Sequence, residues 1–121
     1  MNGDLDDVLS AAAKLGQDGG MPTRLTPELP PRVAAAHKAV SSTARVLVLR
    51  YLMAHPESTR TEIAEGSEQP RGSAWFALRE LEELGYAVHT GTGRSYRYSI
   101  DSEKLRRDLL EFVEWTLGGS E

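Results

Sequence analysis

The chain is 121 residues long, enough for one ordinary domain with a short tail and too short for two. Fourteen basic and eighteen acidic side chains give a net charge of −4, which excludes a globally basic nucleic-acid coat and a polybasic membrane patch. Cysteine is absent, so disulfides, thiolate metal sites and cysteine nucleophiles are excluded. No apolar run approaches the roughly 20 residues that span a bilayer, and we expect a soluble cytoplasmic protein without a membrane partner.

The first 30 residues have the pattern of a flexible tail. Asp4 is a candidate cap for a short helix that Gly16 would end. Glycine and proline then recur up to Pro31, which disfavours any regular element. We therefore expect a tail over residues 1–30, an ordered domain over residues 31–117 and a short tail over residues 118–121.

The next segments predict three helices, with expected ranges 31–40, 44–54 and 59–65. Pro31 is a favourable first-turn residue for the first of them. Ser41 or Ser42 is a candidate cap for the second, which is apolar nearly all round and is therefore expected to lie centrally. Gly66 is expected to end the third.

A longer helix is predicted over residues 70–84, and Gly85 is a typical terminator for it. Its apolar residues share one face, which we expect to lie in the core: Ala74, Leu78, Leu81 and Leu84. Beyond it the apolar period changes from 3.6 to 2, which predicts a two-stranded hairpin over residues 86–100 with a glycine-rich turn. Asp101 or Ser102 would cap a final helix.

The order of helix, short helix, tight turn, longer helix and hairpin is that of a winged helix-turn-helix. We therefore expect a mainly α fold with a small β-hairpin, in which extra helices precede and follow the winged helix-turn-helix. In this fold the longer helix is the recognition helix and the hairpin is the wing.

Several segments resemble ArsR/MarR-type transcriptional regulators. Residues 43–52 are similar to their opening helix, and Glu62-Ile63-Ala64 resembles the E-L-A of their short helix. Residues 79–88 and 93–100 resemble their passage into the wing and their return strand. The resemblance covers about residues 31–117 and implies a winged-helix regulator of transcription.

The metal-sensing members of this family carry a Cys-x-Cys motif or paired acidic and histidine ligands. Here the three histidines are far apart in sequence, at His37, His55 and His89, and none has a histidine partner at helical spacing. We therefore expect neither a metal nor another cofactor.

A recognition helix lays its first turns in the major groove. With Ala74 and Leu78 in the core, the residues expected to face DNA are Arg71, Gly72, Ser73, Trp75 and Arg79. Arg71 has the fork geometry that suits guanine O6 and N7, and Arg79 is expected to meet phosphate. The alternative is that Arg71 is an ordinary solvated arginine.

Two neighbouring aromatic residues, Trp75 and Phe76, lie about 100° apart on this helix and cannot share its core face. We favour Phe76 as the one beneath the hairpin. Trp75 would then reach a thymine methyl group, a sugar or a partner protein.

Further DNA contacts are expected outside the recognition helix. Arg94 at the hairpin tip and Arg97 on its outer face would touch the flanking backbone or the minor groove, although a solvated turn is the alternative. Thr59 and Arg60 open the short helix, whose amides are suited to a phosphate, and simple capping is the alternative. Either Arg45 or Arg50 is expected to pair with Glu80 or Glu83 as a structural salt bridge.

The last helix is predicted to form a homodimer together with the first. The residues assigned to that interface are Val33, Val40, Leu105, Leu109, Phe112, Val113 and Trp115. The pairing would place two recognition helices about one DNA turn apart. The alternative is that the helix folds back on its own domain.

No P-loop, G-x-S-x-G elbow or metal-ligand spacing is present in the sequence, and we expect no enzymatic activity. The leading hypothesis is a sequence-specific regulator that binds double-stranded DNA, most simply a dimeric repressor associated with the nucleoid of a bacterium or archaeon, or encoded by a phage. The alternative is a winged-helix module for protein–protein contact. Net acidity, an exposed aromatic residue and four glutamates favour the alternative: Glu57, Glu62, Glu65 and Glu68.

Overall fold

The computed structural model describes residues 28–118, so the helix expected between Asp4 and Gly16 lies outside the described residues. In chain order the elements are α3 (Pro31–Val40), α4 (Thr43–Ala54), α5 (Arg60–Gly66), α6 (Arg71–Glu83), β1 (Ala87–Thr90), the 3-10 turn η1 (Gly93–Ser95), β2 (Arg97–Ile100) and α7 (Ser102–Thr116). Among the described residues, no helix has both the length and the apolar content of a membrane span.

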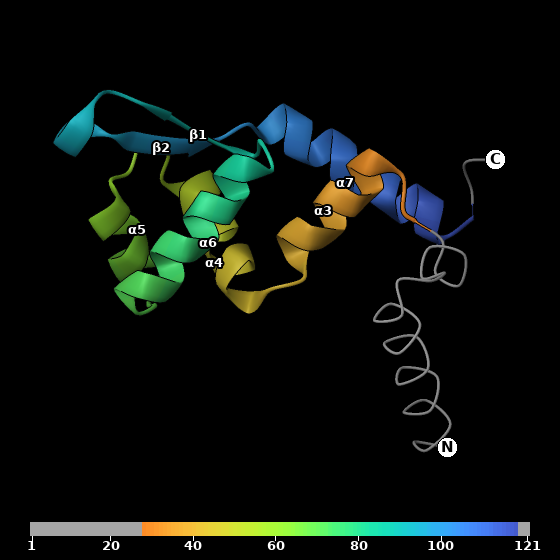
Figure 1. The fold of residues 1–121 in the computed structure, drawn as a ribbon, viewed down its shortest axis with the longest axis horizontal. Helices are drawn as coiled ribbons and strands as arrows, with labels where there is room; N and C mark the ends of the chain where they lie inside the picture. Colours follow the sequence, from red (N-terminus) through yellow and green to blue (C-terminus); the bar gives the residue numbers. More distant parts are fainter. Residues whose placement is uncertain (1–27, 119–121) are drawn as a thin grey trace, which may run out of the picture. The chain divides into compact units, whose positions relative to one another are not determined.

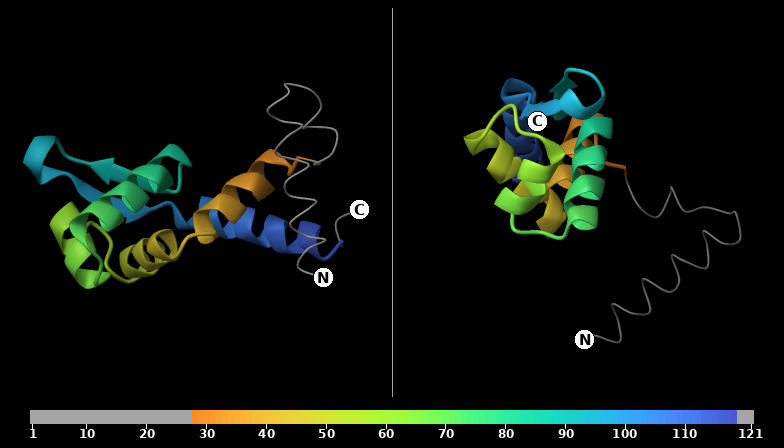
Figure 2. Two further views of the ribbon diagram at one scale, coloured as in Figure 1. Left: turned by 60° about the horizontal axis from the view of Figure 1, so that its bottom comes forward. Right: turned by 90° about the vertical axis from the view of Figure 1, so that its left-hand side faces the viewer.

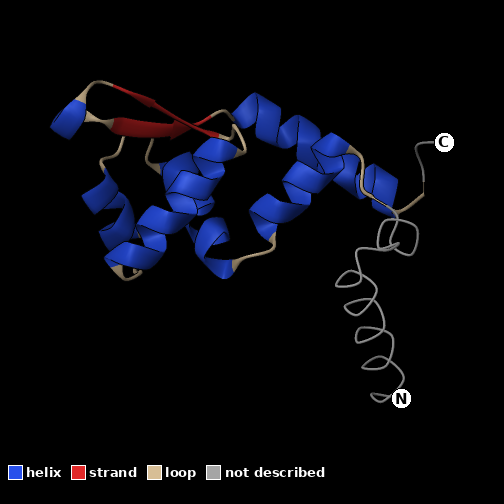
Figure 3. Cartoon of the chain, in the orientation of Figure 1, coloured by secondary structure: helices blue, strands red, loops and turns tan. Residues whose placement is uncertain are grey.

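The helices α4, α5 and α6 form one group, and the hairpin of β1 and β2 lies over it (Figures 1 and 3). The helices α3 and α7 pack against each other and extend away from this group, as Figures 1 and 2 show. The arrangement confirms the expected mainly α fold with a small hairpin and flanking helices.

Local capping explains where the helices begin. Ser42 accepts a hydrogen bond from the backbone N–H of Arg45 at 3.2 Å, and Asp101 accepts one from Lys104 at 3.2 Å. At α5, Thr59 and Glu62 form a reciprocal capping box, with hydrogen bonds of 3.2 and 2.9 Å. These side chains satisfy amides that a helix start leaves without partners.

The core lies where α4, α5 and α6 meet the hairpin. Its largest fully buried side chains include Leu52, Ile63, Leu78, Leu81 and Tyr86. Of the core stripe predicted on α6, Ala74, Leu78 and Leu81 are buried, and Leu84 is half-buried against the same cluster.

The two helix-ending glycines have different roles. Gly85 has a φ of +87°, and the amides of Gly85 and Tyr86 bond back to Glu82 and Leu81, as expected of a glycine terminator. Gly66 ends α5 as expected, although it does so without a positive φ. A Cβ at Gly66 would overlap the ring of Tyr51, so glycine allows α4 and α5 to approach closely.

The hairpin differs in detail from the predicted alternation. In β1 only Ala87 is buried, whereas Val88 pairs with Ser99 and is exposed. The 3-10 turn η1 lengthens the tip, with Gly91 and Gly93 at positive φ as the turn requires. Ser58 exchanges two backbone hydrogen bonds with Tyr98, at 3.2 and 2.8 Å, which attaches the segment before α5 to the edge of the hairpin.

Candidate nucleic-acid interface

The helix α6 has one buried face and one open face. Ala74, Ala77, Leu78 and Leu81 are buried against the core. The opposite stripe follows a 4-3-4 spacing and is exposed along its length: Gly72, Phe76, Arg79 and Glu83. The protein's own residues from 28 to 118 thus leave the outward side of this helix uncovered.

The first turn of α6 is open as expected. Arg71, Gly72 and Ser73 are all exposed. No atom lies within 4 Å of the position that a Cβ on Gly72 would take. Another molecule can therefore approach the backbone closely at this turn.

The expectation for the two aromatic residues of α6 was wrong. Trp75 is half-buried, and its Nε1 donates a hydrogen bond to the backbone oxygen of Arg60 at 3.2 Å. Phe76 is 61% exposed. A signal was present in the sequence, since Phe76 is two positions, or about 200°, from both Ala74 and Leu78 and so faces away from the core.

The arginines of the expected site lie on three elements. The guanidinium carbon of Arg60 lies 4.5 Å from the centre of the Trp75 ring, a cation–π contact that joins α5 to α6. Arg60 and Arg79 line one open groove of about 490 Å³, together with both aromatic residues of α6 and with Tyr98 of the wing. Burial raises the pKa of Tyr98, and the nearby Glu82 carboxylate adds to this, so the hydroxyl remains a neutral hydrogen-bonding group.

Arg97 and Thr59 have partners within the protein. Arg97 donates a hydrogen bond to the backbone oxygen of Glu57 at 3.5 Å and lies 4.0 Å from the Glu62 carboxylate. The Thr59 hydroxyl caps α5 by accepting a hydrogen bond from the Glu62 backbone N–H, which is the alternative given above to a phosphate contact. Arg94 belongs to the turn η1, but its side chain lies outside the described part of the structure.

The glutamates near the end of α6 each have a basic partner. Glu80 pairs with Arg45, Glu82 lies 2.7 Å from His89 Nδ1, and Glu83 lies 3.7 Å from Arg79. His89 also stacks on Tyr96, with ring centres 4.3 Å apart. The two arginine partners weaken the negative potential that Glu80 and Glu83 would present to a polyanion. His89 does the same for Glu82 only when its imidazole is protonated.

The predicted dimer residues fall into two groups. Val33 and Leu105 are buried within the chain, where α3 packs on α7, and have no surface to offer a second subunit, so their assignment was wrong. Leu109 and Phe112 are half-buried, whereas Val40, Val113 and Trp115 are exposed. Sequence reasoning missed Leu110 and Leu117, which join Val113 in an exposed stripe at helical spacing along α7.

No group of three or more metal-ligating side chains is found among the described residues.

Residues 36–91, from α3 into the hairpin, match the family model described as the IclR helix-turn-helix domain. No curated protein matches the sequence.

Solved structures share the fold over most of the described chain. An ArsR family transcriptional regulator is 20% identical, with a TM-score of 0.60 over 79% of this chain and 99% of its own. The homodimeric winged helix-turn-helix DNA-binding domain of a possible ArsR-family regulator from Mycobacterium bovis is 25% identical, with a TM-score of 0.54 over 74% of this chain and 81% of its own. A MarR family transcription regulator is 15% identical, with a TM-score of 0.50 over 98% of this chain and 81% of its own.

The expected resemblance to ArsR- and MarR-type regulators is thereby confirmed. The chain has the winged helix-turn-helix fold of these transcriptional regulators, and its residues 36–91 are similar to the IclR helix-turn-helix domain.

Proposed function

We propose that this protein is a sequence-specific transcriptional regulator that binds double-stranded DNA as a dimeric repressor. The observation that carries the proposal is the open outward side of α6, which presents Arg71 and Arg79 beside an arginine-bearing hairpin. In this arrangement α6 enters the major groove and the hairpin meets the flanking backbone or the minor groove.

Within this site the residues divide by role. Arg71, in the first turn, reads base edges through its planar fork, and Ser73 bonds a base or a phosphate. Arg79 and Arg60 supply positive charge for phosphates. Arg97, which lies near Glu62, supplies positive charge where the hairpin meets the DNA. The match of residues 36–91 to a helix-turn-helix domain supports DNA binding by the region that contains α5 and α6.

A dimer is supported by the apolar stripe on α7. Leu110, Val113 and Leu117 are exposed there, and a monomer in water gains nothing from such a stripe. The homodimeric state of the similar Mycobacterium bovis domain also favours this assembly. Two copies joined through α7 would carry two recognition helices for two half-sites.

Selection from random duplexes, followed by titration of the selected duplex at several salt concentrations, tests the proposal. Four to six arginine–phosphate contacts per dimer give a slope of about 4 to 5 in a plot of log Kd against log salt concentration. Arg71→Ala should reduce the preference for the selected sequence over a scrambled one, because it removes a contact worth about 1–3 kcal/mol.

Arg50→Ala is the matched control, because this exposed arginine lies on α4, outside both the open side of α6 and the exposed stripe of α7. It should leave the sequence preference unchanged. Failure of the wild-type protein to bind any duplex, or binding that does not respond to salt, would refute the proposal in favour of a protein-contact module.

A further inference from the structure

Phe76 is a large apolar side chain on the open side of α6. It is 61% exposed and lies in the middle of the outward stripe of α6, with Gly72 before it and Arg79 after it. Exposing so much apolar surface is unfavourable in water unless a partner covers it. The neighbouring Trp75 already joins α6 to α5, so Phe76 is not required for that contact.

The space around Phe76 is suited to the edge of a base pair. Long side chains on a helix lean toward its N-terminus, which directs this ring toward the turn that contains Gly72. That turn is open, since nothing lies within 4 Å of a Cβ built on Gly72. The ring therefore borders the open turn at the start of α6, where another molecule can approach the backbone of Gly72.

The charges around Phe76 favour a polyanion over an apolar protein surface. Phe76 lies in a groove that Arg60 and Arg79 also line. The same groove is lined by Glu82 and by the aromatic residues Trp75 and Tyr98. The carboxylate of Glu82 lies 2.7 Å from His89, and Arg79 pairs with Glu83 at 3.7 Å while its side chain remains 75% exposed. The Phe76 ring, flanked by arginines, is complementary to an apolar group of DNA flanked by phosphates. In the major groove that group is the 5-methyl of thymine.

We infer that Phe76 is a specificity-determining residue, whose ring contacts the 5-methyl group of a thymine in each half-site. The inference rests on the proposed DNA-binding function and names one base that the site would read. It replaces the expectation that Trp75 makes this contact.

Substitution of deoxyuridine for thymine tests the inference, because it removes only the methyl group. In the selected duplex, each thymine is replaced in turn and the Kd is measured with the wild-type protein. At one position per half-site the wild type should bind about fourfold more weakly, the cost of losing one buried methyl contact. Phe76→Ala should bind the thymine and deoxyuridine duplexes equally well.

Val46→Ala is the matched control, since Val46 is also exposed but lies on α4, outside both α6 and the hairpin. This variant should keep the full response to deoxyuridine. Phe76 is exposed, so its replacement should leave the folded helical content unchanged, which circular dichroism checks.

The outcomes separate the two proposals. If the wild type binds no duplex, the proposed function fails. If it binds but no thymine position responds, or if Phe76→Ala responds as the wild type does, the inference about Phe76 is wrong while DNA binding stands. If Phe76→Ala leaves the Kd for every duplex unchanged, the ring does not contribute to DNA binding and the inference is overturned.

Discussion

Asp108 is an ionisable residue with 1% of its surface exposed, where α7 approaches the start of the hairpin. Its carboxylate accepts hydrogen bonds from the Tyr86 hydroxyl at 2.8 Å and from Arg107 Nε at 3.0 Å. Burial alone would raise the pKa of Asp108, but these hydrogen bonds and the charges of Arg107 and Lys104 outweigh it and lower the pKa. Burial and the bond to Asp108 raise the pKa of Tyr86, so its hydroxyl remains a donor.

Replacing this carboxylate should alter how stability depends on pH. Asp108→Asn is expected to lower the free energy of unfolding at pH 7 by about 1–3 kcal/mol, because a charged acceptor of two hydrogen bonds is lost. A depressed folded-state pKa stabilises the fold above the unfolded-state value of about 3.9 and loses that effect as the pH falls through the folded-state pKa. The difference between wild type and variant should therefore shrink in that acidic range.

Urea unfolding at pH 7, 4 and 3 measures this difference. Glu103→Gln is the control, because Glu103 is an exposed carboxylate on the same helix. It should change the stability little at any of these pH values. A difference between wild type and Asp108→Asn that stays constant down to pH 3 would contradict the assigned pKa direction.

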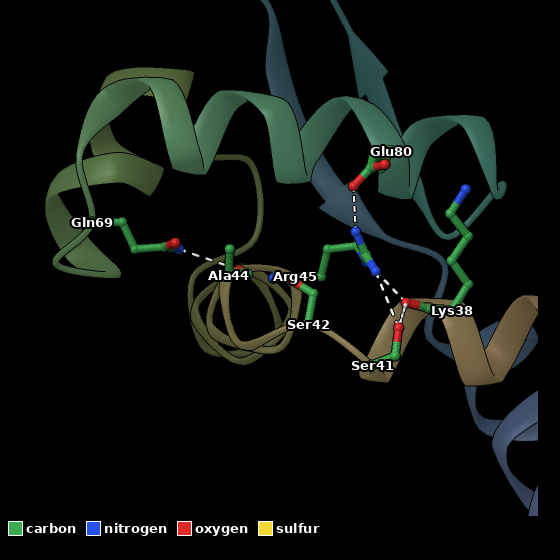
Figure 4. Close-up of polar contacts among 7 residues, drawn as sticks. All are labelled: Lys38, Ser41, Ser42, Ala44, Arg45, Gln69 and Glu80. Atoms are coloured by element: carbon green, nitrogen blue, oxygen red, sulfur yellow. Dashed lines mark hydrogen bonds and ion pairs between the residues drawn. The ribbon is translucent and has the colours of Figure 1, made fainter. Parts of the chain in front are cut away.

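Among the helices, α4 links α6 to α3 through the side chain of Arg45 (Figure 4). Arg45 pairs with Glu80 of α6 and donates hydrogen bonds to the Lys38 backbone oxygen at 2.9 Å and to Ser41 Oγ at 3.2 Å. Gln69, just before α6, donates to the Ala44 backbone oxygen at 3.2 Å on the same helix. The side chains of Arg45 and Glu80 are only 13% and 18% exposed, so water screens this pair weakly.

Removal of Arg45 should therefore cost more than removal of a surface arginine. Arg45→Ala leaves the Glu80 carboxylate half-buried without its cation and is expected to lower the free energy of unfolding by about 2–4 kcal/mol. Arg79→Ala is the matched control, since its pair with Glu83 joins side chains that are 75% and 65% exposed. It should change stability by less than about 1 kcal/mol. Equal losses in chemical denaturation would show that the Arg45 pair is as weak as a surface pair.

The extent to which the sequence predicted these elements depends on how local the signal is. Helix starts were predictable, because Ser42 and Thr59 cap through residues three positions away. A salt bridge from Arg45 or Arg50 to Glu80 or Glu83 was expected, but the choice depends on how α4 crosses α6, which spacing alone does not determine. The pairing of Trp75 with Arg60 escaped prediction for the same reason, since it joins two helices.

The assignment of the dimer residues shows the same limit at the scale of the molecule. The apolar spacing correctly placed Val33 and Leu105 on buried faces of their helices. The same spacing arises whether the helix that covers such a face belongs to the same chain or to a second subunit. In the structure α3 covers one side of α7 within the chain, while Leu110, Val113 and Leu117 form a second, exposed stripe. The proposed dimer uses this second stripe, so its interface lies on a different face of α7 from the one that the sequence predicted.

Charges placed on this stripe should separate assembly from folding. In Leu110→Glu/Val113→Glu the chain should sediment as a monomer at concentrations where the wild type is a dimer, because unpaired carboxylates would be buried in the interface. The helical content should be unchanged, since both positions are exposed within the chain. Val88→Glu, on the hairpin, should remain dimeric and controls for added charge.

The same variant also tests how dimerisation contributes to DNA binding. A monomer holds one recognition helix and makes about half of the phosphate contacts, so the slope of log Kd against log salt concentration should fall to about half of the wild-type value. Affinity for a duplex with two half-sites should fall steeply, because the second helix no longer binds as part of the same molecule. Affinity for a single half-site should fall little, because α6 and the hairpin are unaltered. A monomeric variant that keeps the full salt slope would mean that one chain carries the whole DNA contact, and the exposed stripe on α7 would then need another partner.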